Sequence, residues 1–270
     1  TRKESSAASD VYKRQNKFEF RMLGSSDSIA CANIMLNSAV AESLKIYADR
    51  LEKAEDFETT LHEMIGKTIK DHKNIIFNGN GYDDTWIKEA TEKRGLLNYR
   101  TTPDCVPHIL DPKNVKMLTS HKVFSEAEIR SRYEITLDNY CKTIIIEANT
   151  MVDMARTEIA PAVEAYALSL ARTAAAKKAL DKDILCGYES RLVKKLSALT
   201  DRISVKTDEL EQALIDLKGI EDIGEQANAI RDIVLIKMNE LRLACDEAEV
   251  ITAKKYWPFP TYGDLLFGVK

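Results

Sequence analysis

The chain has 270 residues, of which 44% are hydrophobic, with a formal net charge of −4 and an isoelectric point near 5.7. A chain of this length can bury a sizeable core, as one large domain or two modest ones. Its acidic balance offers no broad basic field to a phosphate backbone, and no apolar stretch approaches the roughly 20 residues of a membrane span, so we expect neither a nucleic-acid partner nor a membrane.

Residues 1–15 differ in composition from the rest of the chain. They are rich in Ser, Ala and charge and contain no initiator methionine. The stretch looks like a translated adapter at the end of a reading frame, so we treat residues 1–15 as a non-native tail and leave them out of the fold prediction. We therefore expect the chain to be a fragment of a longer protein.

A short alternating segment, residues 16–21, predicts a β-strand. Successive strand side chains point to opposite faces, so Phe18 and Phe20 share one face and Glu19 and Arg21 share the other, about 7 Å apart. A carboxylate and a guanidinium placed in this way can hold a metal ion beside an anion. On these residues alone, a surface ion pair on an edge strand explains the pattern equally well.

Two helices are predicted after the strand. Asn33 is the expected cap of the first, and Asp56 is the expected cap of the second. Apolar residues recur at spacings of three and four on one face of each helix, and we expect both faces to lie in the core. The two stripes are Leu36, Val40, Leu44, Tyr47 and Leu51, then Phe57, Leu61, Ile65 and Ile69.

The glycine-rich residues 78–82 interrupt the helical pattern. A dinucleotide fingerprint would need a third glycine where the chain has Asp84, and the lysine of a phosphate-binding loop is missing as well. We therefore interpret 78–82 as a tight loop whose glycines permit positive φ, followed by a short helix over 86–94 that Gly95 ends. Residues 96–122 contain three prolines and predict an irregular connector with at most short helices.

The second half of the chain predicts long helices. Ser125 and Glu128 form a capping box for a helix that continues, with a kink at Pro161, to about Lys178. Three long apolar stripes joined by short connections predict an antiparallel bundle. The stripes run over 129–159, 192–217 and 227–245. The proline-containing aromatic tail, 256–262, cannot be helical throughout; we expect it to pack on its own body, with a grip on a neighbouring subunit as the alternative.

The cysteines and histidines do not form a site in the sequence. Five cysteines are widely spread and never spaced as Cys-x-x-Cys, which argues against a disulfide framework or a zinc site and favours a reducing cytoplasm. The pair His62-Glu63 fails the zinc-helix pattern because Gly66 stands where the second histidine is required. We interpret all of these residues as structural.

Several motifs in the same order resemble the C-terminal part of type III glutamine synthetase. The matching strings are NKFEFRMLGSS at 16–26, FNGNGY at 77–82, KRGLLNYRTTPD at 93–104, SRYEI at 131–135, YCKTI at 140–144, and residues 256–267. The resemblance covers residues 16–270. It implies a mainly α chain, in which 16–73 hold the last strand and helices of the catalytic domain and 74–270 form a helical C-terminal extension.

The resemblance also implies an activity, that of an ATP-dependent glutamate–ammonia ligase. Such an enzyme phosphorylates the side-chain carboxylate of glutamate, and ammonia then displaces phosphate from the acyl phosphate to give glutamine. Mg²⁺ or Mn²⁺ neutralises the phosphates. The family's Glu-x-Arg pair falls on Glu19 as a metal ligand and on Arg21 as a catalytic contact to the phosphate or acyl intermediate. Family members also form large ring-based homo-oligomers.

The rest of the family's active site has no counterpart in this stretch. Its other metal-binding carboxylates, its metal-binding histidine and its nucleotide-contacting segments would all lie upstream of residue 16. One carboxylate and one arginine do not assemble a two-metal phosphoryl-transfer site, so we expect the 270-residue chain alone to be inactive. The competing hypothesis is a non-enzymatic helical interaction or assembly module, in which Glu19 and Arg21 are incidental.

Overall fold

The computed structural model describes residues 28–81 and 83–268, and the strand predicted at 16–21 lies outside them. The described residues are mainly helical and contain no strand, which confirms the predicted mainly α class.

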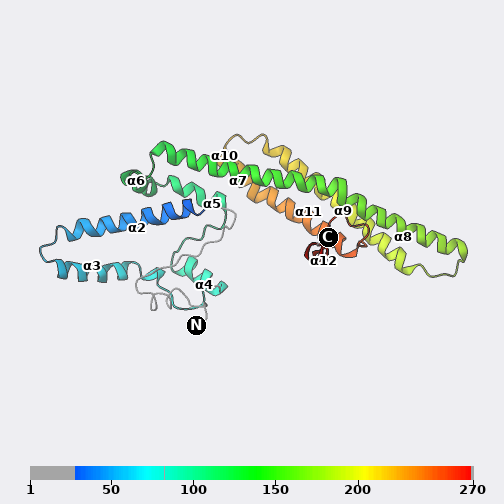
Figure 1. Ribbon diagram of the computed structural model, residues 1–270, viewed down its shortest axis with the longest axis horizontal. Helices are drawn as coiled ribbons and strands as arrows, with labels where there is room; N and C mark the ends of the chain where they lie inside the picture. Colours follow the sequence, from blue (N-terminus) through cyan, green and yellow to red (C-terminus); the bar gives the residue numbers. More distant parts are fainter. Residues whose placement is uncertain (1–27, 82, 269–270) are drawn as a thin grey trace. The chain divides into compact units, whose positions relative to one another are not determined.

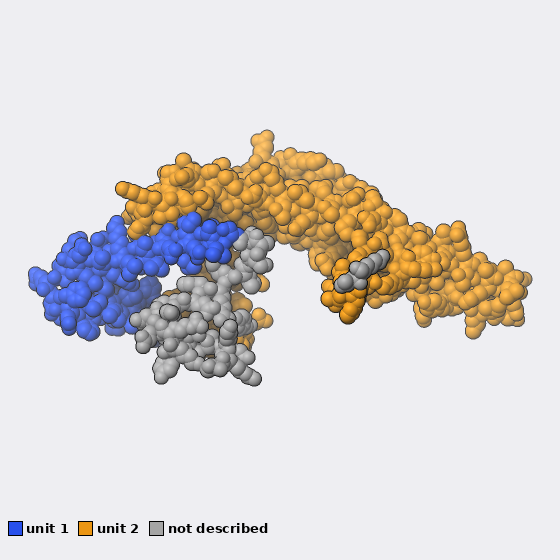
Figure 2. All heavy atoms as spheres, in the orientation of Figure 1, with its two compact units in different colours: residues 1–73 blue, residues 74–270 orange. Residues whose placement is uncertain are grey.

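The chain divides into two compact units, Thr1–Lys73 and Asn74–Lys270, coloured separately in Figure 2. The assignment of 16–73 to a catalytic domain and of 74–270 to an extension stays a prediction. None of the described helices is both long and apolar enough to span a bilayer.

The α-helices of the described residues follow one another with few long connections. They are α2 Ala30–Leu51, α3 Phe57–Asp71, α4 Asp84–Lys88, α5 Thr102–Cys105, α6 Pro112–Ser120, α7 Glu126–Met154, α8 Ala160–Leu180, α9 Gly187–Leu217, α10 Ile223–Ala229, α11 Leu235–Ile251 and α12 Tyr262–Phe267. Short 3₁₀ turns lie at Lys73–Ile75 and Val106–Leu110, and π-helical turns lie at Glu89–Lys93, Ala155–Ile159 and Ile230–Val234.

In the first unit, α2 and α3 form an antiparallel hairpin (Figure 1). Asp56 caps α3 as predicted, because its carboxylate accepts hydrogen bonds from two backbone N–H groups of the first turn, one of them Glu58 at 3.1 Å. The predicted cap of α2 is wrong. The helix begins at Ala30, and the backbone N–H of Asn33 donates inside it to the carbonyl of Ile29 at 3.0 Å.

The predicted core stripes of this hairpin are also wrong in part. Val40 and Leu44 on α2, and Phe57, Ile65 and Ile69 on α3, are exposed. The only buried residues of the two helices among those described are Ser38 and Met64. Periodicity identifies the apolar face of a helix, but it does not say what covers that face.

In the second unit, one helical path runs through α7 and α8 from Glu126 to Leu180 (Figure 1). The predicted capping box is present: the carboxylate of Glu128 accepts from the backbone N–H of Ser125 at 2.7 Å. Proline lacks the N–H of a regular helical turn, and its ring crowds the carbonyl four residues earlier. The helix continues past Pro161 because the π-helical turn Ala155–Ile159 comes directly before α8 and widens the backbone there.

Helix α9 packs antiparallel to α8 and to α11, which confirms the predicted bundle. Lys177 near the end of α8 pairs with Glu189 near the start of α9, whereas Arg156 pairs with Glu211 toward the other end of α9 at 2.8 Å. The predicted stripes form the core. The fully buried large side chains of α7, α8, α9, α11 and the π-helical turn Ile230–Val234 include Leu137, Val163, Leu196, Ile203, Leu210, Ile230, Val234 and Leu241.

A four-member ion-pair network joins α9 to α11. The ammonium of Lys206 lies 2.9 Å from a carboxylate oxygen of Glu209 and 2.9 Å from one of Glu240. The ammonium of Lys237 lies 2.7 Å from Glu209 and 3.3 Å from Glu240. Each charge therefore faces two partners of opposite sign, an arrangement that favours the antiparallel register.

The aromatic tail packs on its own body, as predicted. Trp257 and Phe259 lie against the bundle core, and the ring of Tyr256 is 5.3 Å from that of Tyr166 on α8. The tail then enters α12 through a capping box in which Asp264 accepts from the backbone N–H of Thr261 at 2.9 Å. The end of the described chain is thereby fixed to the second unit.

Candidate functional site

The residues predicted to carry chemistry, Glu19 and Arg21, lie outside the described residues, so their roles stay predictions. Within the part of the chain that the structure describes, no three His, Cys, Asp or Glu side chains are grouped in a way that could hold a metal ion. The motifs at 77–82 and 93–104, in contrast, are described in full apart from residue 82. Their geometry shows what these segments do locally.

Arg94, in the motif 93–104, holds the segment around the motif 77–82. Its Nε and Nη2 donate to one carboxylate oxygen of Glu89 at 2.9 and 2.7 Å, and its Nη1 donates to the backbone carbonyl of Ile76 at 2.9 Å. The guanidinium lies 4.8 Å from the ring centroid of Trp86, and Trp86 stacks on Phe77 at 3.7 Å. The arginine therefore joins the segments on both sides of the glycine-rich loop. Its guanidinium N–H groups donate hydrogen bonds while its planar face lies against the Trp86 ring.

The glycine-rich loop depends on this aromatic stack. A Cβ atom at Gly79 would lie 2.6 Å from the ring of Phe77, so a larger residue there would have to displace that ring from its stack on Trp86. Positive φ, however, is not what the loop requires: among the described glycines only Gly95 adopts it, at 67°. The predicted positive φ of the loop glycines is thus wrong for Gly79 and Gly81, and close approach is the reason for the first of them.

Gly95 ends the short helix, as predicted. It follows α4 and the π-helical turn Glu89–Lys93, and the next backbone N–H, that of Leu96, donates back to the carbonyl of Ala90 at 2.9 Å. This bond reaches six residues back along the chain, past a left-handed glycine, and satisfies a carbonyl near the end of the helix. The motif from 93 to 96 is therefore a helix stop that also positions Arg94.

The second motif is joined to the helical bundle by Asp104. Thr101 caps α5 by accepting from the N–H of Asp104 at 3.3 Å, and the Asp104 carboxylate pairs with Arg231 in the π-helical turn before α11. Arg231 also holds Asp232 at 2.7 Å, and that carboxylate, followed by Asp104, raises the pKa of its guanidinium. The contact between Arg231 and Asp104 joins segments that are 127 residues apart in the chain.

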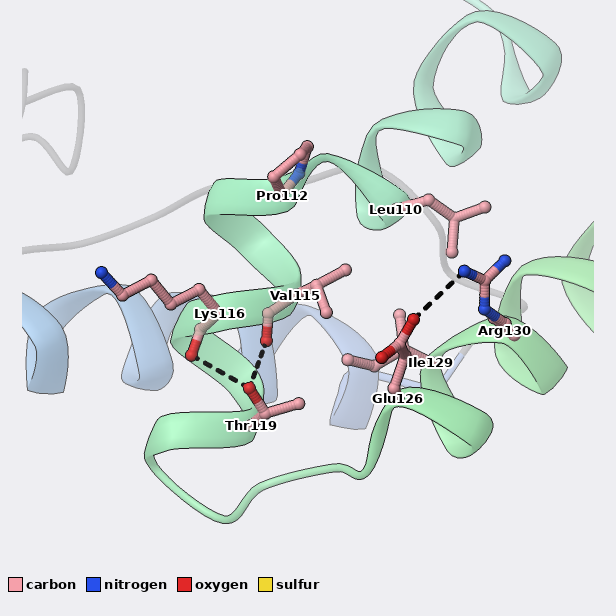
Figure 3. A pocket seen from close by; sticks show the side chains of 8 residues that line it. All are labelled: Leu110, Pro112, Val115, Lys116, Thr119, Glu126, Ile129 and Arg130. Carbon is pink, nitrogen blue, oxygen red and sulfur yellow. Dashed lines mark hydrogen bonds and ion pairs between the residues drawn. The ribbon is translucent and has the colours of Figure 1, made fainter.

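A surface hollow of about 500 Å³ lies between α6 and the start of α7 (Figure 3). Arg130 and Glu126 point toward one another at its edge, with 3.1 Å between their charged atoms, and the hydroxyl of Thr119 donates to the carbonyl of Val115 at 2.8 Å. The remaining lining residues include Leu110, Pro112, Lys116 and Ile129. The Arg130–Glu126 and Thr119 contacts each stay within one helix and engage these polar groups, which does not favour a catalytic use.

Among the described residues, the segments 77–82 and 93–104 therefore have a structural role. Arg94 and Asp104 are engaged by neighbouring groups and fix loops in place, and neither is aimed at an open reaction site. Sequence reasoning missed both contacts. The signal for the first was present, because Phe77, Trp86 and Arg94 stand at either end of a predicted loop and helix, whereas nothing local indicated Arg231 as the partner of Asp104.

Comparison with known proteins gives one family. Residues 60–178 match the family model described as glutamine synthetase C-terminal domain. A glutamine synthetase of Butyrivibrio fibrisolvens is 35% identical over 80% of this chain and 31% of its own length. A type-3 glutamine synthetase of Dictyostelium discoideum is 31% identical over 93% of this chain and 35% of its own length, and a glutamine synthetase of Bacteroides fragilis is 28% identical over 93% and 36%. The chain thus spans about a third of the length of the curated relatives it matches.

Proposed function

The chain belongs to the glutamine synthetase family, and on this premise we propose that it is part of an ATP-dependent glutamate–ammonia ligase. The enzyme transfers the γ-phosphoryl group of ATP to the side-chain carboxylate of glutamate, which gives ADP and an acyl phosphate. Ammonia then attacks the acyl carbon, and phosphate leaves as glutamine forms. The observation that carries the proposal is the similarity to relatives named glutamine synthetase over most of the chain.

Glu19 and Arg21 are the residues of this chain assigned to the chemistry. Glu19 is a metal ligand, because Mg²⁺ and Mn²⁺ prefer carboxylate oxygen. Arg21 binds the transferred phosphoryl group or the acyl phosphate, since its planar fork matches phosphate oxygens and positioned positive charge assists phosphoryl transfer. Bound metal would supply charge neutralisation of the ATP phosphates. Among the described residues, no three His, Cys, Asp or Glu side chains are grouped so as to hold a metal ion.

The proposal extends to the rest of the parent protein. The remaining metal ligands and the nucleotide-binding residues belong to the part of the family that this chain does not span, so the 270-residue chain alone does not catalyse the reaction. The bundle formed by the second unit serves assembly of a large homo-oligomer, and the protein works in the cytoplasm without a nucleic-acid or membrane partner. Support for an assembly role comes from the long helices α8, α9 and α11, which pack on one another and are joined by ion pairs.

Site variants in the complete gene product test the proposal. Glu19→Gln should lower kcat/KM for glutamine formation on the order of 100-fold and raise the Mg²⁺ concentration for half-maximal rate, because a neutral amide is a poorer ligand. Arg21→Lys should lower kcat with less effect on the metal requirement. The matched controls are the exposed residues Glu249→Gln and Arg242→Lys. Equal activity in Glu19→Gln and Glu249→Gln would overturn the assignment of Glu19.

A further inference from the structure

The turn between α8 and α9 holds two strongly exposed leucines. Leu180, the last residue of α8, is 84% exposed. Leu185, two residues before α9, is 87% exposed, the highest fraction among the large apolar side chains that the structure describes. Figure 1 shows the turn at the outer end of the α8–α9 hairpin, and we call residues 172–195 the hairpin tip. Neither leucine contributes to the core of its own chain.

The turn is ordered by its own polar groups. The backbone N–H of Ile184 donates to the carbonyl of Asp181 at 3.3 Å, and that of Asp183 donates to the Asp181 carboxylate at 2.8 Å. The ammonium of Lys178 donates to the carbonyl of Lys182 at 2.6 Å. These polar groups bond within the turn while the two leucines face water, which is the reverse of an ordinary surface turn. The leucines are therefore held in place for an outside contact.

The hairpin tip has a positive net charge, opposite in sign to that of the whole chain. It contains seven basic and three acidic residues, a net charge of +4, whereas the chain has a net charge of −4. Two of its cations are neutralised, because Lys177 pairs with Glu189 and Lys195 pairs with Glu247 on α11 at 3.2 Å. Unpaired positive charge therefore flanks the exposed leucines. The cations without a carboxylate partner among the described residues are Arg172, Lys178, Lys182, Arg191 and Lys194.

Two hollows of the second unit do not offer free acidic groups to this surface. In the hollow between α6 and α7, the carboxylate of Glu126 pairs with Arg130 at 3.1 Å. A second hollow, of about 300 Å³, lies between α9 and α11 and has Glu209 and Asp216 among its lining residues. Two lysines hold Glu209, and Asp216 accepts from the side-chain amide of Gln212 at 2.8 Å. The carboxylates of both hollows are already engaged, which favours a different protein over a second copy as the partner.

We propose that the hairpin tip docks on a different protein, through an acidic segment of that partner that also contains apolar side chains. The apolar side chains of the partner cover Leu180 and Leu185, and its carboxylates pair with the free cations around them. An apolar centre with a charged rim is the usual anatomy of a protein interface, and opposite charges select the partner and speed its association. The inference does not depend on the proposed ligase chemistry.

Fluorescence anisotropy on the purified 270-residue chain tests the proposal with synthetic peptides. The probe is a labelled amphipathic helix of roughly 18 residues, with Leu at spacings of three and four and Glu at the other positions. It should bind with a dissociation constant on the order of 10 µM. Peptides with Lys in place of Glu, or with Ser in place of Leu, should bind at least about tenfold more weakly. No binding of the Glu peptide, or equal binding of the Glu and Lys peptides, would overturn the proposal.

A leucine variant locates the contact on the hairpin tip. Leu185→Ser should raise the dissociation constant of the Glu peptide at least about tenfold, because one leucine is no longer buried on binding. The matched control is Leu243→Ser, which changes an exposed leucine of α11 and should bind like the wild type. Both positions are exposed, so circular dichroism should show unchanged helical content. Equal binding by the two variants would place the contact elsewhere and refute the proposal.

A charge variant tests the role of the free cations. Arg191→Gln combined with Lys194→Gln should weaken binding of the Glu peptide about fivefold at low salt and much less in about 0.5 M salt, because salt screens exposed charges. The matched control, Lys113→Gln combined with Lys218→Gln, removes two exposed cations from other parts of the second unit and should bind like the wild type. An equal effect of both double variants would mean that net charge alone attracts the peptide, which would contradict docking at the hairpin tip.

Two further measurements distinguish other partners. Sedimentation velocity should give the same self-association for Leu185→Ser and Leu243→Ser, because the proposed partner is not a second copy. Vesicles that contain phosphatidylglycerol should not bind the hairpin tip, because the two aspartates of the turn lie between the leucines and would meet the lipid phosphates. Self-association lost only in Leu185→Ser, or vesicle binding that this variant abolishes, would overturn the proposal in favour of a second copy or a lipid surface.

Discussion

Replacing Arg94 with lysine should loosen the glycine-rich loop while leaving the bundle intact. Lysine keeps the positive charge and can still reach Glu89, but it has no planar fork. The substitution therefore removes the simultaneous contacts of the guanidinium with the Ile76 carbonyl, the Glu89 carboxylate and the face of Trp86.

The magnitude follows from the lost contacts. Two backbone carbonyls, those of Asn74 and Ile76, lose a donor, at a net cost of about 1 kcal/mol each. The cation–π contact with Trp86 contributes roughly 0.5 kcal/mol more, since the Arg94 side chain is about three-quarters buried. A local loss of about 2.5 kcal/mol raises the open population of the loop roughly seventy-fold.

Hydrogen exchange measured by mass spectrometry reports this population directly. Protection of the amides of Trp86, Ile87 and Leu96, which donate in the helix that follows the loop, should fall by about the same seventy-fold factor. Amides of α9 should be unchanged. The control is Arg130→Lys, which alters an exposed i,i+4 ion pair and should leave exchange in this region as it is. If the two variants exchange alike, Arg94 does not organise the loop.

Three further outcomes are expected. Leu210→Ala, in the fully buried core, should lower the free energy of unfolding by about 3 kcal/mol in urea titrations, whereas Val205→Ala, exposed on the same helix, should change it by less than about 0.5 kcal/mol. Hydrogen bonds from Lys237 and then from Lys206 hold the pKa of the Glu209 carboxyl below its ordinary value of 4.5. The stabilisation that this carboxylate gives the folded chain is therefore complete above pH 4.5 and is lost as the pH falls through the depressed pKa. The difference in Tm between wild type and Glu209→Gln should vanish at that low pH, and a difference that stays constant with pH would contradict the pairing. Burial raises the pKa of the Cys245 thiol to about 11, so iodoacetamide at pH 8 should label the exposed cysteines of the folded chain and leave Cys245 unlabelled; early labelling of Cys245 would contradict its burial.

Sequence pattern alone was sufficient for the bundle. In the second half of the chain, apolar residues at spacings of three and four predicted the buried positions, including Leu196, Ile203 and Val234, and the capping box at Ser125 was correct. These features are local, since a helix start and an apolar stripe are set by residues within a few turns of one another. Long helices make such patterns dense enough to be reliable.

The first unit shows where the pattern fails. Val40 and Ile65 belong to clear stripes, yet the structure leaves both exposed. A stripe gives the direction of the apolar face, and the surface that covers it must come from elsewhere. The predicted cap at Asn33 failed for a related reason, because a good capping residue can also lie inside a helix that starts one turn earlier.

The contacts of the candidate site were the hardest to predict. The requirement for glycine at Gly79 depends on the position of the Phe77 ring, which is set by Trp86 and Arg94 together. The pairing of Asp104 with Arg231 joins distant segments and has no local signature. Glu19 and Arg21 were assigned through family resemblance, and their geometry lies outside the described residues.

The most direct test of the ligase assignment compares the complete gene product with the 270-residue chain in one assay. Both are supplied with glutamate, ammonia, ATP and Mg²⁺, and glutamine and ADP are quantified together. The account predicts that the complete product forms glutamine and ADP in equal amounts and that the chain alone forms neither. The account would be contradicted if the chain alone formed as much glutamine as the complete product. It would also be contradicted if a folded complete product formed no glutamine with Mg²⁺ and none when Mn²⁺ replaced it.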